Sequence, residues 1–182
     1  MSNVIEILEQ DHREIEEIFR ELESLSGQTS DDAVAKRKEL VQQVTMELAR
    51  HSVAEEVIVY PPVASKISEE EAEHAKKEHA EAEEHLAALE KLDPDSAEFE
   101  AELAELMKDI RHHIEDEEED MFAHMRETFS EDDLRSMGTK VEAFKKVAPT
   151  RPHPNVPNDA LSRLAAGPLA SVVDRLRDLA RG

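Results

Sequence analysis

The sequence predicts an all-α protein: an up-down-up-down antiparallel four-helix bundle with a short fifth helix and a C-terminal tail of short helices. Three observations support this fold class. Only 4 of the 182 residues are glycine, whereas glutamate, alanine, leucine and lysine are abundant, as is typical of long helices. Apolar residues recur at steps of three and four along most of the chain. The breaks between these stretches are short, which favours antiparallel neighbours.

Start and stop signals place each helix in turn. Ser2 is the expected N-cap of the first helix, and Pro61 ends the second because proline lacks the N–H that a helix needs. Three glutamates after Ser68 suit the positive end of the third helix dipole. Ser130 and Asp133 form a capping box at the start of the fifth. The expected helices cover residues 2–25, 31–60, 68–93, 96–128 and 130–147.

The composition changes after the first domain, which we assign to residues 1–147. Four of the 8 prolines lie between positions 149 and 157, which predicts an extended linker over residues 148–158. Residues 159–182 carry leucines and valines at roughly helical spacing, with arginines between them, and predict an amphipathic tail. We expect this tail to pack on the acidic bundle, to join two copies as a homo-oligomer, or to touch a membrane surface.

Composition also excludes several classes of protein. The chain has 44 acidic and 22 basic residues, and its net charge of -22 argues against a nucleic-acid partner, since phosphate binding needs a basic face. It has no cysteine, which excludes disulfides, thiol catalysis, iron–sulfur clusters and cysteine-type zinc sites. No apolar run is long enough for a transmembrane segment or a secretory signal, so we expect a cytoplasmic protein.

Every long helix has histidine on its apolar face, and two of them add a glutamate one turn later. Histidine and glutamate four residues apart lie on the same side of a helix. A buried carboxylate is costly unless it is paired or binds a cation, so shared metal ions explain both acids. In an antiparallel bundle all these residues fall in one half, about 6–21 Å from one end at about 1.5 Å per residue. They are His12, His51, Glu55, His79, His113 and Glu117.

Imidazole and carboxylate ligands suit iron, manganese or zinc. Two ions are favoured over one, because six or seven ligands exceed the needs of a single tetrahedral ion. His74 is a further candidate ligand, although five residues of α-helix place it about 140° from His79. Tyr60, the single tyrosine, either reaches the metals as a hydrogen-bond donor or ligand, or packs at the helix end. Glu56 and Glu118 are expected to face solvent or to hold histidine N–H groups.

These motifs resemble the hemerythrin family, specifically bacterial hemerythrin-like proteins with an HHE cation-binding domain. The resemblance covers residues 1–147 and consists of Asp11-His12, His51-x-x-x-Glu55-Glu56, Tyr60-Pro61, Glu78-His79 and His113-x-x-x-Glu117-Glu118. It implies a four-helix bundle around two non-heme iron ions, joined by an oxo or hydroxo bridge and by carboxylates, with no heme. The implied ligands are His12, His51, Glu55, His79, His113 and Glu117, with the two glutamates as bridges.

The chain departs from the oxygen-carrying members in two motifs. They have His-x-x-x-His in the third helix, where this chain has His74-x-x-x-x-His79. They have His-x-x-x-x-Asp in the fourth helix, where this chain has His113-x-x-x-Glu117. The resulting site is richer in carboxylates, which favours oxygen or peroxide chemistry over reversible binding.

The leading functional hypothesis is therefore a di-iron protein that binds or reacts with a small ligand, namely O2, H2O2 or NO. If it turns over, we expect a catalase-like oxidoreductase. One alternative is an iron-sensing or iron-buffering protein without catalytic turnover. Another is a helical interaction module with no metal, which would leave Glu55 and Glu117 buried without compensation.

Overall fold

The computed structural model of the protein describes residues 2–147, and every regular element in that range is a helix. The all-α prediction is confirmed. The predicted linker, 148–158, and the predicted tail, 159–182, lie outside the described residues.

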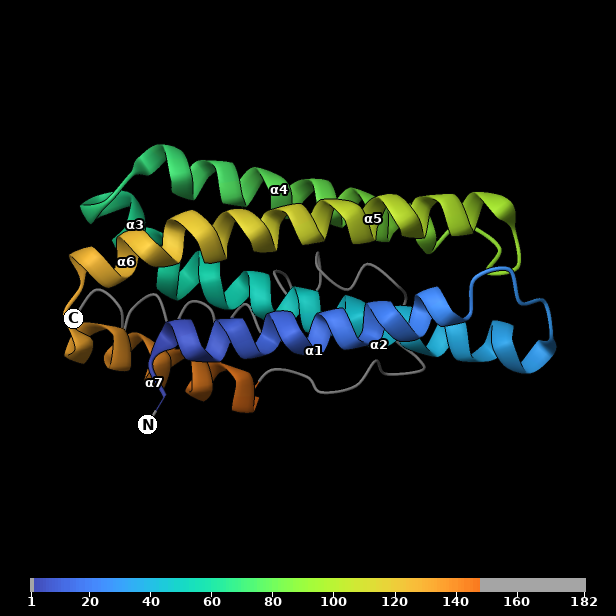
Figure 1. Ribbon diagram of the computed structural model, residues 1–182, viewed down its shortest axis with the longest axis horizontal. Coiled ribbons are helices and arrows are strands. Elements are labelled where there is room, and N and C mark those ends of the chain that lie inside the picture. The colour runs from blue at the N-terminus through green and yellow to red at the C-terminus, as the bar shows by residue number, and fades with distance from the viewer. Residues whose placement is uncertain (1, 148–182) are drawn as a thin grey trace.

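Four long rods run alternately up and down, as predicted (Figure 1). The second and fourth rods each consist of an α-helix, a five-residue π-helix and a short α-helix in unbroken succession. A fifth helix packs against the first, at the end of the bundle where the two short helices also lie (Figure 1). In chain order the elements are α1 (Val4–Ser24), α2 (Asp31–Ala54), η1 (Glu55–Val59), α3 (Tyr60–Lys66), α4 (Glu69–Leu89), α5 (Ala97–Asp116), η2 (Glu117–Met121), α6 (Phe122–Thr128) and α7 (Glu131–Val147).

Side-chain caps define the helix starts. Asn3, not the predicted Ser2, caps α1: its side chain accepts from the Glu6 N–H at 3.1 Å, and the Glu6 carboxylate accepts from the Asn3 N–H at 3.0 Å. This reciprocal pair satisfies the backbone N–H groups of Asn3 and Glu6. A cap at Ser2 would lie one residue too early to form the same pair with Glu6. The capping box predicted at Ser130 is confirmed, and Ser68, where the third helix was expected to begin, is the N-cap of α4.

The second rod continues to Lys66, beyond the end predicted at Pro61. In η1 the Tyr60 N–H bonds to the carbonyl of Glu55, five residues back. Tyr60 is the first residue of α3, and Pro61 and the proline after it follow within its first turn. A missing N–H costs little at the first turn of a helical segment, so the π-turn lets the rod pass through both prolines.

Two apolar clusters fill the bundle, and polar residues lie between them. One cluster includes Leu8, at the end where α3, α6 and α7 gather; the other includes Ile15 and fills the remaining half. His12 lies between these two residues in sequence, and His79 likewise lies between Ala75 of the first cluster and Ala82 of the second. The buried histidines and glutamates therefore form a layer that apolar side chains close on both sides.

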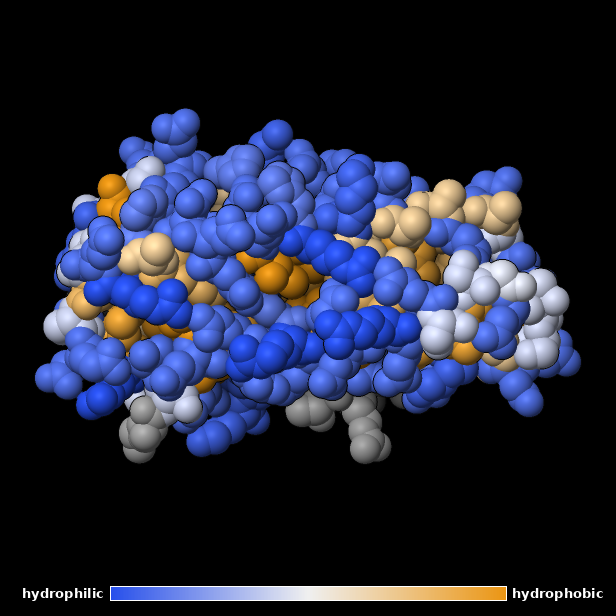
Figure 2. Space-filling model, in the orientation of Figure 1, coloured by the Kyte–Doolittle hydropathy of each residue, from blue (hydrophilic) through white to orange (hydrophobic). Residues whose placement is uncertain are grey.

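The outer surface is mostly hydrophilic, with apolar side chains visible in the hollow between α1 and α5 (Figure 2). Within residues 2–147, no helix is long and apolar enough to cross a membrane.

Arg37 is the one buried residue among the aspartates, glutamates, lysines and arginines of α2, and it is only 2% exposed. Its guanidinium donates to the carbonyls of Leu25 (2.8 Å), Gln28 (2.9 Å) and Pro94 (2.6 Å), and pairs with Glu100 at 2.9 Å. It therefore ties together the two loops at the end of the bundle farthest from α7.

Gly138 brings α7 against the start of α1. A Cβ at this position would lie 2.8 Å from the Ser2 carbonyl oxygen and 3.0 Å from the Val4 nitrogen, both of them backbone atoms. Gly138→Ala should therefore destabilise the protein by about 1–2 kcal/mol in urea unfolding, because the overlap outweighs the gain of about 1 kcal/mol that alanine normally brings to a helix. A more stable variant would show that the two helices separate easily.

Candidate metal centre

Two pairs of buried histidines face each other in the polar layer. The first pair joins α1 to α2, with His12 Nε2 3.2 Å from His51 Nε2. The second joins α4 to α5, with His79 Nε2 3.2 Å from His113 Nε2. All four rings are buried. Two nitrogens that bind one ion, each about 2.1 Å from it, lie at a similar separation of about 3 Å.

Two fully buried glutamates connect these pairs. Glu55 Oε2 lies 3.2 Å from the Nε2 of His51 and 3.3 Å from that of His79. Glu117 Oε2 lies 3.4 Å from the Nε2 of His12 and 3.7 Å from that of His113. Each carboxylate thus contacts one histidine of each pair. The ligand atoms form two groups with Glu55 in both: His12, His51, Glu55 and Glu117 in one, and Glu55, His79 and His113 in the other.

The outward nitrogen of every one of these histidines contacts a further carboxylate. An Nδ1–H that donates to a carboxylate fixes the tautomer and leaves the Nε2 lone pair directed inward, as a metal ligand requires. The four contacts are His12 with Glu118 (2.8 Å), His51 with Asp11 (3.5 Å), His79 with Glu56 (3.1 Å) and His113 with Glu78 (2.9 Å).

For Glu56 and Glu118 this role is one of the two that the sequence predicts, the other being exposure to solvent, whereas Asp11 and Glu78 were not predicted to contact histidines. Those two acids directly precede His12 and His79, so the signal was present in the chain. Adjacent residues on a helix point about 100° apart, however, and each acid contacts the histidine of the neighbouring rod. Only the packing of the rods could assign them.

The π-turns bring an aromatic ring to each half of the centre. Residues five apart in a π-turn are joined by a backbone hydrogen bond and so lie nearly in line along the helix. Tyr60 follows Glu55 in this way and stacks on His79, with 5.5 Å between ring centroids. Phe122 follows Glu117 in the same way and stacks on His12 at 5.9 Å.

Tyr60 is fully buried, and its hydroxyl lies at the middle of the cluster. It donates to Glu117 Oε1 at 2.8 Å and lies 3.3 Å from both Glu55 Oε2 and His79 Nε2. Burial raises the pKa of Tyr60 well above its usual value, and the two carboxylates add to the effect. The phenol therefore keeps its proton, and its position matches the hydrogen-bond donor among the roles expected for Tyr60.

Burial and neighbouring charges change the pKa values of the buried acids and histidines. It raises the pKa of Glu55 well above the usual value, and the charge of Glu117 raises it further. Burial also acts to raise the pKa of Glu117, but its interactions with the nearby imidazoles of His113 and His12 outweigh it and lower that pKa. Burial lowers the pKa of His51 to about 4, so this imidazole is neutral at pH 7. Neutral imidazole is the form that binds metal.

Cations fit this donor set. Among the described residues, Glu55 Oε1 and Glu117 Oε2 are buried and have no hydrogen-bond partner. An unpartnered carboxylate oxygen in an apolar interior is costly, and a metal ion satisfies it. The inward Nε2 lone pairs of the four histidines can likewise be satisfied by a metal ion.

The structure does not bring His74 to this cluster. Its side chain is 57% exposed and lies beside Glu78 and Asp116 on the surface. The 140° offset from His79 explains this position, because α4 has no π-turn between the two residues. The other expected positions, from His12 to Glu117, all lie in the buried layer.

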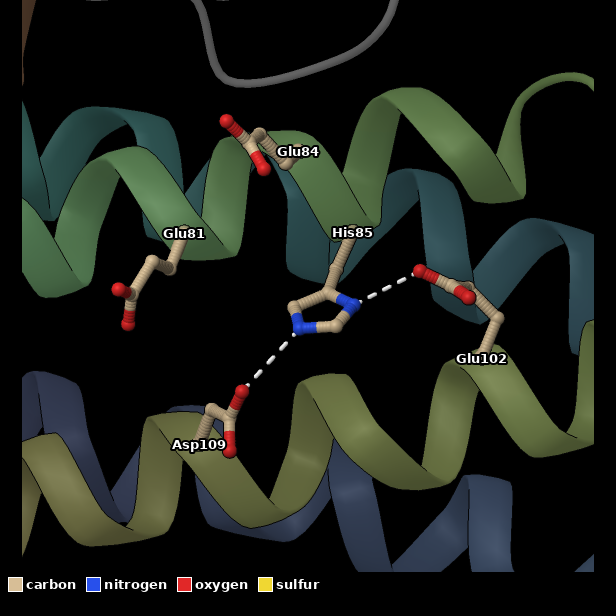
Figure 3. A pocket seen from close by; sticks show the side chains of 5 residues that line it. All are labelled: Glu81, Glu84, His85, Glu102 and Asp109. Atoms are coloured by element: carbon tan, nitrogen blue, oxygen red, sulfur yellow. Dashed lines mark hydrogen bonds and ion pairs between the residues drawn. The ribbon is translucent and has the colours of Figure 1, made fainter.

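His85 lies apart from the cluster and links α4 to α5. Its Nδ1 contacts Glu102 at 2.7 Å and its Nε2 contacts Asp109 at 3.1 Å, in a surface pocket that Glu81 and Glu84 also line (Figure 3). Burial lowers the pKa of His85, but the hydrogen bonds to the two carboxylates outweigh it and raise the pKa above 6.5.

This arrangement predicts a pH-dependent contribution to stability. A histidine with a raised folded pKa stabilises fully below its unfolded value of 6.5, and the contribution is lost as the pH rises through the folded pKa. His85→Gln should therefore lower the free energy of unfolding by about 0.5–1 kcal/mol at pH 6 and by less at pH 9. Urea unfolding at both pH values checks this, and an equal loss at both would contradict it.

Comparison with known proteins identifies relatives of the chain. A family model described as the hemerythrin HHE cation-binding domain matches residues 3–125. An uncharacterized hemerythrin-like protein of Schizosaccharomyces pombe is 32% identical over 182 residues, which cover 98% of this chain and 87% of that protein. A DNA nickase of Nostoc is 27% identical over 143 residues, which cover 79% of this chain but only 39% of the nickase.

A solved structure has the same fold. It is a hemerythrin HHE cation-binding domain-containing protein from Mycobacterium kansasii, with a TM-score of 0.70 and 22% sequence identity. The match covers 96% of this chain and 99% of that one.

Proposed function

Because the chain belongs to the hemerythrin family of HHE cation-binding domains, we propose that its buried cluster is a non-heme di-iron centre that binds or reacts with O2, H2O2 or NO. One observation carries the proposal: Glu55 and Glu117 each contact one histidine of each pair. Two bridging carboxylates between two imidazole pairs are the donor set for two ions close together, and oxygen and nitrogen donors without thiolate suit iron.

The residues divide into two matched half-sites. His12 and His51 would hold one ion, and His79 and His113 the other, with the two glutamates shared. When bound, a pair of iron ions supplies redox chemistry and an open coordination position for a small ligand.

The surrounding side chains hold these donors in place and control protons and water. The carboxylates on the Nδ1 atoms keep the four rings oriented. Tyr60 holds a proton at its hydroxyl, directed at Glu117 Oε1. The Phe122 ring covers His12, and apolar clusters on both sides of the layer exclude water. A dry site limits loss of iron and unwanted oxidation.

Anaerobic reconstitution with Fe(II) tests the proposal. We expect about two irons per chain and a change in the visible spectrum on addition of O2, peroxide or NO. Gas evolution from peroxide would assign catalase-like turnover. Reversible iron exchange with no spectral response would favour an iron-buffering protein instead, and retention of zinc alone would contradict the di-iron assignment.

A further inference from the structure

A second group of metal-binding side chains lies on the surface beside the buried cluster. His74 and Glu78 of α4 face Asp116 at the end of α5. His74 Nε2 lies 3.5 Å from Glu78 Oε1 and 3.7 Å from Asp116 Oδ2. One ligand atom from each of these residues falls within 4.8 Å of the others. His112 adds a second imidazole, with its Nδ1 3.5 Å from the other oxygen of Asp116.

The two carboxylates of this group pair only with histidines among the described residues. Glu78 contacts His74 and His113, and Asp116 contacts His74 and His112. The nearby Lys76 and Lys77 pair with other acids, Glu73 and Glu81. No lysine or arginine within residues 2–147 therefore neutralises Glu78 or Asp116 through an ion pair.

Glu78 connects this group to the buried cluster. Its Oε2 accepts the Nδ1–H of His113 at 2.9 Å, which leaves Oε1 toward His74. Its side chain is 13% exposed, whereas that of His74 is 57% exposed, so the group extends from the interior to solvent. An ion at Oε1 would leave the hydrogen bond of His113 intact.

We propose that His74, Glu78 and Asp116, with His112 beside them, form a separate surface site for a divalent transition-metal cation. Mixed imidazole and carboxylate donors suit a borderline ion such as Zn²⁺, Mn²⁺ or Fe²⁺. Because the site is open to water, it binds more weakly and exchanges faster than the buried cluster. Such a site would also account for the position of His74, which lies on α4 but outside its apolar face.

Zinc titration of the full chain tests this site. The wild type should show one more weakly bound Zn²⁺ per chain in calorimetry than His74→Ala or Asp116→Asn, or an affinity for that ion at least about tenfold higher. Glu78 stays unchanged because it also holds His113. The matched control is His124→Ala: His124 is 47% exposed and contacts a single acid, Glu71, so its loss should change nothing.

The result does not depend on what the buried centre binds, because the wild type and the three variants all contain that centre. Only the difference in Zn²⁺ binding between them is compared. In parallel, Zn²⁺ should shift the ring NMR signals of His74 and His112 while leaving those of His124 unchanged. Unchanged circular dichroism confirms that the exposed substitutions leave the fold intact. Identical isotherms for wild type and both variants would overturn the proposal and leave these residues as surface ion pairs.

Discussion

Glu55→Gln should reduce the iron content of the reconstituted protein from about two ions per chain to at most one. Glu55 lies 3.2 Å from His51 and 3.3 Å from His79, so it is the acid common to both ligand groups. An amide has the same shape as the carboxylate but lacks its charge and binds these metals poorly. Glu117→Gln should have the same effect, because Glu117 likewise contacts both halves.

Metal analysis after gel filtration measures this effect. His85→Gln is the matched control, since His85 contacts two carboxylates but lies outside the buried layer, and its iron content should equal that of the wild type. Two irons per chain in Glu55→Gln would show that the carboxylate does not bridge, and the di-iron proposal would then lose its main support.

The sequence was sufficient to predict the bundle and the residues of the polar layer. Apolar residues at steps of three and four define one face of a helix, and any histidine or glutamate on that face must be buried. His12 and Glu117 were found in this way, from local spacing alone. The start of α4 after Ser68 was equally predictable, because a serine cap acts within three residues.

Features that depend on the π-turns were not predictable. Ideal helical geometry places Tyr60 well away from Glu55, and only the π-turn of η1 brings the hydroxyl back toward the centre. The same turn carries the rod past Pro61, where a sequence rule ends the helix. In both cases the local rule assumes regular α-helix. A π-turn costs backbone energy, and such turns frequently mark functional sites.

The two halves of the centre have matching parts, two of which differ in residue type: Asp11 corresponds to Glu78 among the acids on the outer nitrogens, and Tyr60 corresponds to Phe122 among the rings. A histidine pair, a glutamate that begins a π-turn and an aromatic ring five residues later occur in both. Tyr60 has a hydroxyl where Phe122 has none, so only one half places a proton donor against the bridging acids. This difference would make the environments of the two proposed ions unequal, as expected if a small ligand binds at only one of them.

The acids that serve a metal centre should weaken the protein when metal is absent. Glu55 is fully buried beside Glu117, and its Oε1 has no hydrogen-bond partner among the described residues. Glutamine at position 55 removes the ionisable group and can donate its amide N–H to Glu117. Glu55→Gln should therefore raise the free energy of unfolding in chelator by about 1–3 kcal/mol.

With Fe(II) present, the wild type should instead be more stable than Glu55→Gln. Wild type at an Fe(II) concentration about 1,000 times its Kd gains about 4 kcal/mol, because the ions bind only the folded state, whereas Glu55→Gln has lost most of this binding. Anaerobic urea unfolding with chelator and with Fe(II) measures both effects, with Glu84→Gln as a control because that exposed residue of α4 lies outside the buried layer. If Glu55→Gln were the less stable protein in chelator, Glu55 would be stabilising the metal-free fold, and its burial would need no cation.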